Sequence, residues 1–299
     1  MKTPKEKKKR HIIWYVLYSI LLIMGFLYYL FPEDAFIDYL KATADKRNAE
    51  YLHFIQHMEL GFPPGVTLQG LRLARKSEPE RSLFKARRLT VRPAMRSLVD
   101  GRPKICFDSR AYKGELDGCI RFGNRRFQSP VNVSVQLKDL RLEDYAYMED
   151  MIGRRVSGLL GGVLEYSGNP KAWMRGEGEG DLRIANGRVE LVQPLFIFES
   201  IDFEEVTARF VLKNQRINLT QMQLNSPDIK GSLSGSIVLK NKLARSILSL
   251  KGTIEPYAGL FKGNKGGAGA LQFFKNRLRQ GKLTFTVRGT LEEPRFKLI

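Results

Sequence analysis

The stretch from Gly176 to Leu191, GEGEGDLRIANGRVEL, decides the fold class. Glycine, leucine and isoleucine occupy the even positions of 176–184, and charged side chains occupy the odd positions of 177–183. Alternation with a period of two predicts a β-strand with one apolar face. A P-loop needs Gly-x-x-x-x-Gly-Lys followed by Ser or Thr, and a dinucleotide-binding turn needs Gly-x-Gly-x-x-Gly opening a helix. Neither is present, and the acidic side chains repel phosphate, so we interpret the stretch as a strand.

A short glycine motif extends this pattern to other parts of the chain. Gly-x-Leu-x-Gly followed by any residue and then Ile or Leu is found at 114–120, 158–164 and 231–237. On a strand the glycines and aliphatic residues of the motif share one face. Glycine inside a strand costs stability, so it predicts either strong coiling of the sheet or a gap in which an apolar molecule lies against the backbone. The candidate residues lining an apolar trough of this kind are Leu116, Ile120, Leu160, Leu164, Leu182, Ile184, Leu233 and Ile237. The alternative is a structural domain in which the glycines serve curvature alone.

Alternation of apolar and polar residues dominates the chain after the Gly61–Gly65 turn. The segments 131–137, 208–212 and 283–287 show it most clearly. The pattern predicts a mainly β protein: a large, strongly curved antiparallel sheet with one wet face and a few flanking helices. We expect helices at 142–155 and at 271–280, the second basic and amphipathic.

The N-terminal region carries the features of a membrane anchor. Residues 1–11 are a basic tail, and 12–31 are twenty residues without a charge, long enough as a helix to span a bilayer. The positive cluster before this segment predicts a cytoplasmic N-terminus and translocation of everything after it. A cleaved signal peptide is the alternative, but its apolar region is normally shorter and its cleavage site closer. We predict a transmembrane helix at 12–31, a juxtamembrane helix and linker at 32–60, and a periplasmic β-rich domain at 61–299.

Charge and cysteine usage limit the partners. The formal net charge is +19, from 50 basic and 31 acidic residues. Spread charge of this size favours acidic partners such as lipid headgroups, and no nucleic-acid recognition motif accompanies it. Cys106 and Cys119 lie in the two arms of an expected hairpin with its turn at Tyr112–Lys113. Outside the cytoplasm they are able to form a disulfide, and two reduced cysteines are the alternative.

The sequence offers little chemistry for catalysis. No histidine follows His57, which removes the commonest general base from the sheet region. His53 and His57 have a helical metal-binding spacing but no third ligand nearby. Ser82 and Lys85 match Ser-x-x-Lys without the companion motifs of that enzyme class. We therefore expect no enzyme activity, no metal and no cofactor.

Taken in order along the chain, these features resemble the type II secretion system protein N family and, more distantly, AsmA-type periplasmic proteins. The resemblance rests on the basic tail and anchor followed by several short stretches: FPEDA at 31–35, PGVTLQGL at 64–71, GLLGGVLEYSG at 158–168, GEGEGDLRIANGRVEL at 176–191, IKGSLSG at 229–235 and RGTLEEPRF at 288–296.

The resemblance implies a single-pass protein of the bacterial inner membrane with a periplasmic β-rich domain. It implies a non-enzymatic part of a type II protein secretion system that docks to other secretion components. The AsmA relatives imply the alternative, a lipid-binding or lipid-transfer protein with an apolar groove that binds phospholipid and serves outer-membrane biogenesis. Neither family implies catalytic residues.

Overall fold

The computed structural model describes most of the chain from residue 51 onward. The described residues are 14–15, 18–19, 22, 25–26, 51–61, 64–99, 101–124, 130–145, 155–195, 198–257 and 281–299. The chain divides into two units, Met1–Ala49 and Glu50–Ile299. The second unit contains every strand of the described residues and is described below.

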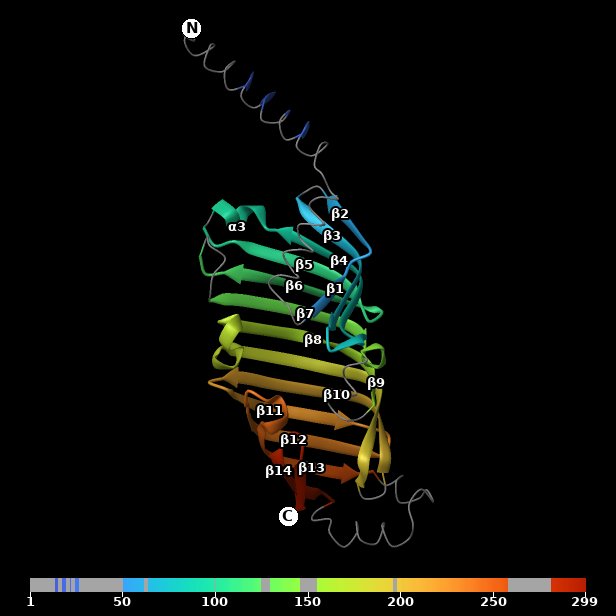
Figure 1. The fold of residues 1–299 in the computed structure, drawn as a ribbon. Helices are drawn as coiled ribbons and strands as arrows, with labels where there is room; N and C mark the ends of the chain where they lie inside the picture. The colour runs from blue at the N-terminus through green and yellow to red at the C-terminus, as the bar shows by residue number, and fades with distance from the viewer. Residues whose placement is uncertain are drawn as a thin grey trace, which may run out of the picture. The chain divides into compact units, whose positions relative to one another are not determined.

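One antiparallel sheet of fifteen strands makes up this unit in the described part of the chain (Figure 1). The strands are β1 (Tyr51–Phe54), β2 (His57–Gly61), β3 (Gly65–Arg75), β4 (Glu78–Pro93), β5 (Lys104–Ala111), β6 (Gly114–Phe122), β7 (Val131–Arg141), β8 (Val156–Gly168), β9 (Glu177–Leu195), β10 (Phe198–Lys213), β11 (Arg216–Asn225), β12 (Ile229–Val238), β13 (Ile247–Pro256), β14 (Leu283–Thr290) and β15 (Pro294–Leu298). From β3 onward each strand pairs with the next along the chain. The prediction of a mainly β protein with one large antiparallel sheet is confirmed, and 176–191 is part of strand β9, apart from Gly176 just before it.

The helices of the described residues from 51 onward are short. They are α3 (Met95–Val99) and the 3-10 helices η1 (Leu142–Asp144), η2 (Pro170–Arg175) and η3 (Leu243–Arg245). Of the helix predicted at 142–155, η1 forms the first turn, and 146–154 lie outside the described residues. The helix predicted at 271–280 lies wholly outside them.

The predicted anchor at 12–31 and the basic tail fall mostly on residues that the structure does not describe. Among the residues that it does describe, none belongs to a helix with the length and apolar character needed to span a bilayer.

The prediction of a helix and linker at 32–60 is wrong for the residues from 51 onward. Tyr51–Phe54 and His57–Gly61 are strands, β1 and β2, and both pair with β3. Gln56 lies between them opposite Gly70, whose φ of +63° admits glycine readily. β1 and β2 have only 4 and 5 residues, too few for a period of two to identify a strand in the sequence. His53 lies on β1 and His57 begins β2, so the two histidines do not share a helical face.

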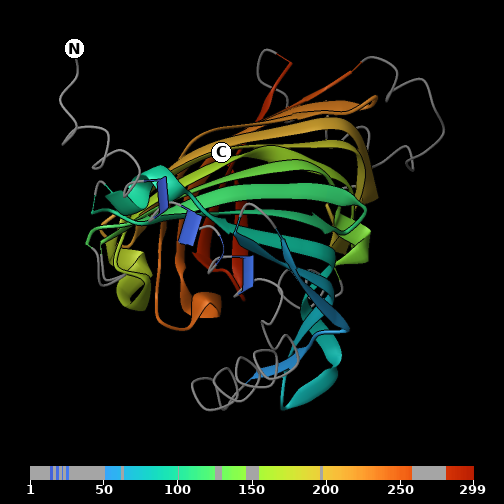
Figure 2. The ribbon, with the colours of Figure 1, turned by 90° about the horizontal axis from the view of Figure 1, so that it is seen from above.

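The strands bend, as the view in Figure 2 shows, but the sheet stays an open ladder and is not strongly curled. The strong curvature predicted from the glycines is therefore not found. The glycine contacts described below give the physical reason, because most of the space beside these glycines is filled from within the sheet.

The turn predicted at Tyr112–Lys113 is confirmed. Both residues have positive φ, 49° and 58°, and Ala111 pairs with Gly114 on either side of them. Two successive positive φ values are the pattern of a type I′ hairpin turn.

Candidate functional site

The strand register gathers apolar residues into one row that crosses the whole sheet. Each member of this apolar row is the direct partner of the next across a pair of neighbouring strands. From β2 to β15 the members are Leu60, Val66, Val91, Phe107, Gly118, Val135, Leu164, Gly180, Phe210, Leu219, Gly235, Leu250, Val287 and Phe296. With neighbouring strands about 4.8 Å apart, the row is about 60 Å long.

The adjacent row, one residue along each strand, faces the other side of the sheet and is polar. From β4 to β15 it runs through Arg92, Cys106, Cys119, Ser134, Glu165, Glu179, Val211, Asn218, Ser236, Ser249, Arg288 and Arg295. Successive residues of a strand point to opposite faces. The sheet therefore has one apolar face and one polar face along its length.

The eight predicted trough residues all lie on the apolar face. Leu160 pairs directly with Ile184, and Leu182 pairs with Gly162. Leu116 and Ile120 pair with Leu137 and Val133 of the next strand. Leu233 and Ile237 occupy the same face of β12, opposite Met222 and Ile217.

The two ends of this face differ in burial. Leu233 and Ile237 pack against a buried cluster of Leu248, Leu250 and Val287. The other six predicted residues, on β6, β8 and β9, are only half-buried. The described residues place no second layer of structure over these central strands, since each described helix has six residues or fewer. The candidate binding surface is therefore the central part of the face, from β6 to β10.

Aromatic rings fill the space beside several glycines of the apolar face. Three glycines each lie directly opposite a phenylalanine: Gly118 opposite Phe107, Gly180 opposite Phe210, and Gly252 opposite Phe285. A Cβ added to any of these glycines would lie under 3.0 Å from the ring of its partner. The gap that the sequence predicted for a foreign molecule is thus occupied by the protein's own side chains at these positions. Together, glycine and ring form a smooth apolar surface.

Gly162 and Gly235 have a different reason to be glycine. Their φ values are +140° and +137°, and a Cβ on either lies under 3.0 Å from a backbone oxygen of the next strand. Each lies beside a one-residue bulge in the neighbouring strand. The bulge beside Gly162 falls between Leu137 and Leu140 of β7, and the bulge beside Gly235 falls between Leu219 and Met222 of β11. The second glycines of these two motif copies are therefore equivalent in structure.

Ion pairs on the polar face involve two of the acidic residues of 176–191. Glu177 pairs with Lys213 at 2.9 Å and Asp181 pairs with Arg209 at 2.8 Å, in both cases directly across β9 and β10. Arg183 pairs with Glu205 of the same strand β10. The charged residues are thus an exposed cross-strand network, which contributes modestly to stability.

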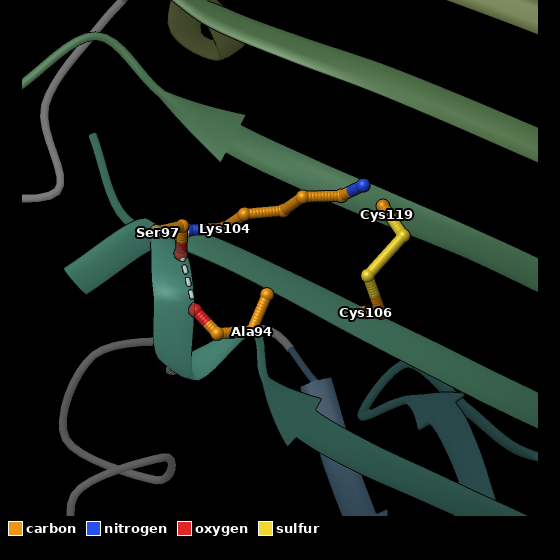
Figure 3. Close-up of a disulfide and its surroundings, with 5 residues drawn as sticks. All are labelled: Ala94, Ser97, Lys104, Cys106 and Cys119. Carbon is orange, nitrogen blue, oxygen red and sulfur yellow. Dashed lines mark hydrogen bonds between the residues drawn. A yellow bond between two sulfur atoms is a disulfide. The ribbon is translucent and has the colours of Figure 1, made fainter. Parts of the chain in front are cut away.

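Cys106 and Cys119 form a disulfide across β5 and β6, with an Sγ–Sγ distance of 2.14 Å (Figure 3). Of the two alternatives left open by the sequence, the structure has the oxidised one. The bond lies in the polar row, beside the point where α3 is attached to β5. There the Lys104 amide donates to Ser97 Oγ at 2.8 Å, and Ser97 Oγ donates to the Ala94 carbonyl at 2.6 Å.

The residues considered for catalysis are dispersed. Ser82 Oγ accepts a hydrogen bond from Arg72 Nε at 2.7 Å, and Lys85 lies on the exposed side of β4. No group of three His, Cys, Asp or Glu side chains within the described ranges is placed to hold a metal ion.

Two features of the site were not predicted from the sequence. One is the phenylalanine rings that lie against the glycines, and the other is the unequal burial of the two ends of the apolar face. For Phe107 a signal existed, since it and Gly118 are equally far from the turn at Tyr112–Lys113. For Phe210 and Phe285 no signal existed, because long or irregular connections leave the register undefined by the sequence.

Comparison of the chain with protein-family models, with curated proteins and with solved structures found no match in any of the three.

Proposed function

We propose that this protein is a non-enzymatic lipid-binding protein that holds the acyl chains of phospholipid on its apolar face. The observation that carries the proposal is the apolar row, which is unbroken over fourteen strands and only half-buried in its central part. Monomeric proteins rarely expose a contiguous apolar patch of more than a few hundred Å². The half-buried apolar strip across β6 to β10 is a surface of the kind that marks a binding site.

An acyl chain suits this surface better than a polar ligand. The backbone groups of the central strands are used in pairing between strands, so none is free to recognise a polar ligand. The hydrophobic effect is non-directional and proportional to the area removed from water. A flat apolar strip therefore favours long hydrocarbon chains over molecules that need specific hydrogen bonds.

The disulfide and the charge favour a periplasmic location close to a membrane. Disulfides persist in oxidising compartments, and Cys106 and Cys119 are bonded. The net charge of +19 suits an anionic lipid surface. With the anchor predicted at 12–31, we propose a single-pass inner-membrane protein whose sheet lies in the periplasm.

The experiment is to purify the full-length chain in a neutral detergent and identify bound lipid by mass spectrometry. The test variant carries Leu164→Gln and Leu182→Gln, and its matched control carries the changes on the neighbouring polar-face residues, Val163→Gln and Arg183→Gln. Burying a half-exposed leucine under lipid stabilises the complex by about 1 kcal/mol. Two such losses weaken binding about 30-fold.

We expect phospholipid to copurify with the wild type and the control, and to be lost from the test variant at an unchanged melting temperature. A well-folded wild type that carries no lipid, and acquires none when lipid is added, rejects the proposal.

A second candidate function is docking in a type II secretion system. The observation that favours it is the edge strand β15, which pairs only with β14 in the described structure. An unpaired edge is able to accept a strand from another protein. Arg295 and Lys297 lie on this strand and are exposed, which disfavours self-association and leaves the edge to an acidic partner segment.

This second function is tested by deleting the gene and measuring secretion of folded proteins. Leu298→Pro removes an amide from the outer edge of β15, because the amides of Lys297 and Ile299 face β14. Loss of secretion that Leu298→Pro reproduces, while bound lipid is unchanged, supports docking through β15. Normal secretion after deletion, together with altered outer-membrane lipid, rejects it.

A further inference from the structure

Three loops at one edge of the sheet form a continuous surface. In an antiparallel ladder every second connection returns to the same edge. The loop containing η2 (169–176), the β10–β11 turn (214–215) and the loop containing η3 (239–246) meet this condition. We call them together the basic edge, for the side chains described below.

Backbone hydrogen bonds join these loops. The Gln215 amide donates to the Met174 carbonyl at 2.8 Å, and the Leu239 amide donates to the Gln215 carbonyl at 2.7 Å. Within the η3 loop, the fully buried Ser246 accepts at Oγ from the Lys240 amide at 3.2 Å. The three loops are thus held in fixed relation, although they are far apart in sequence.

Cations outnumber acids strongly along the basic edge. With the flanking strand ends included, it carries seven exposed basic residues, Lys171, Arg175, Lys213, Arg216, Lys240, Lys242 and Arg245, and one acid, Glu177. Glu177 pairs with Lys213. None of the other six makes an ion pair with an acidic side chain that the structure describes. Two further acids, Glu292 and Glu293, lie on the neighbouring β14–β15 turn, where the Glu292 amide donates to the Ala244 carbonyl at 3.0 Å.

Acidic and basic side chains balance among the described residues at the opposite edge of the same strands. There Asp202 pairs with Arg188 at 3.0 Å, and Glu255 pairs with Lys282 at 2.7 Å. Among the residues that the structure describes, the excess of positive charge therefore lies at one edge.

The apolar face begins directly beside the basic edge. Leu212 precedes Lys213, and Ile217 follows Arg216. Leu212 and Ile217 are direct partners on the apolar face. A molecule that lies along the strands with its hydrocarbon part on the apolar face thus places its other end among the cations.

We propose that the basic edge binds the phosphate of an anionic phospholipid whose acyl chains lie on the apolar face. This inference rests on the function proposed above and adds to it the orientation of the lipid and the class of its headgroup. Lysine and arginine side chains bind phosphate through charge-assisted hydrogen bonds. The charge excess on one edge fixes which end of the strands receives the headgroup.

The test compares phosphatidylglycerol with phosphatidylcholine of identical acyl chains. Each is titrated into the full-length chain in neutral detergent, and bound lipid is counted by native mass spectrometry. We expect phosphatidylglycerol to bind at least about tenfold more tightly at low salt. The preference should fall away when the salt concentration is raised, because salt screens exposed charges.

The variant Lys240→Gln, Lys242→Gln, Arg245→Gln removes three cations from the η3 loop. The matched control, Lys76→Gln, Lys85→Gln, Lys230→Gln, removes three exposed cations elsewhere. We expect the η3 variant to lose the preference for phosphatidylglycerol while its affinity for phosphatidylcholine stays unchanged. The control should keep both affinities.

The outcomes separate the two proposals. If neither lipid binds, the lipid-binding function fails and the headgroup site fails with it. If both lipids bind equally to the wild type, or if the η3 variant keeps the preference, the headgroup site alone is wrong. Displacement of phosphatidylglycerol by inorganic phosphate at similar concentration also overturns it, because the edge is then a site for free anions.

Discussion

Gly162→Ala is the substitution that tests most sharply why glycine lies inside these strands. Gly162 has a φ of +140°, a conformation that side chains bearing a Cβ rarely adopt. An alanine Cβ there also lies under 3.0 Å from the carbonyl oxygen of Asp181. The neighbouring residue, Gly161, is the matched control, since its nearest contact is the Leu137 carbonyl oxygen at 3.6 Å and its φ is ordinary.

The expected magnitude follows from two terms. Holding a residue with a Cβ in a sparsely populated backbone conformation costs about 2 kcal/mol. Displacing the Asp181 carbonyl weakens a ladder hydrogen bond by about 1 kcal/mol. Gly162→Ala should therefore lower the free energy of unfolding by about 3 kcal/mol, a large part of the 5–15 kcal/mol typical of a domain. Gly161→Ala should change it by less than about 1 kcal/mol, in the stabilising direction, because alanine restricts the unfolded chain.

The assay is urea unfolding of the full-length chain, followed by far-ultraviolet circular dichroism. Gly235→Ala should reproduce the loss, because Gly235 has the same backbone conformation and the same contact with the next strand. Equal urea midpoints for Gly162→Ala and the wild type would refute the reasoning, and so would equal losses for Gly161→Ala and Gly162→Ala.

Three further predictions concern the disulfide, an alkaline transition and an ion pair. Replacing Cys106 and Cys119 together by serine, or reducing the bond, should cost about 3 kcal/mol in urea unfolding, because the bond closes a short loop in the unfolded chain; no change on reduction would contradict this. Burial chiefly raises the pKa of Tyr112 to about 12 from 10.0, opposed by the hydrogen bond from the Lys85 amide. The neutral phenol is favoured in the folded state, so this stabilisation is complete below pH 10 and is lost as the pH rises through about 12; Tyr112→Phe should flatten the loss over that range, and a curve parallel to wild type would count against it. Arg209→Ala breaks the exposed pair with Asp181 and should cost less than about 1 kcal/mol, which the same urea assay measures.

Alternation in the sequence was enough to predict a large antiparallel sheet after residue 61 and the side of its clearest strands that is apolar. The pattern at 131–137 and 176–184 is one example, because a period of two has a single structural meaning when one face is buried. The turn at Tyr112–Lys113 was also predictable from the sequence, since pairing Cys106 with Cys119 across a hairpin places these two residues at its centre.

Register and burial were not predictable, because both depend on partners distant in the chain. The face of β12 that carries Leu233 and Ile237 looked identical in sequence to that of β8, yet it packs against Leu248 and Val287. The glycines suggested strong curvature because nothing in the sequence shows that Phe210 lies against Gly180. The strands β1 and β2 were missed because they have only 4 and 5 residues, too few to show a period of two clearly.

The most direct measurement of the central claim is photo-crosslinking along β8 and β9 in membranes that contain the full-length chain. A photoreactive amino acid replaces Leu164 or Leu182 on the apolar face, or the neighbouring Glu165 or Arg183 on the polar face. Mass spectrometry then identifies what each position has bonded to. The account predicts lipid adducts at Leu164 and Leu182 and none at Glu165 and Arg183. Adducts at both members of each neighbouring pair, or at neither, contradict it.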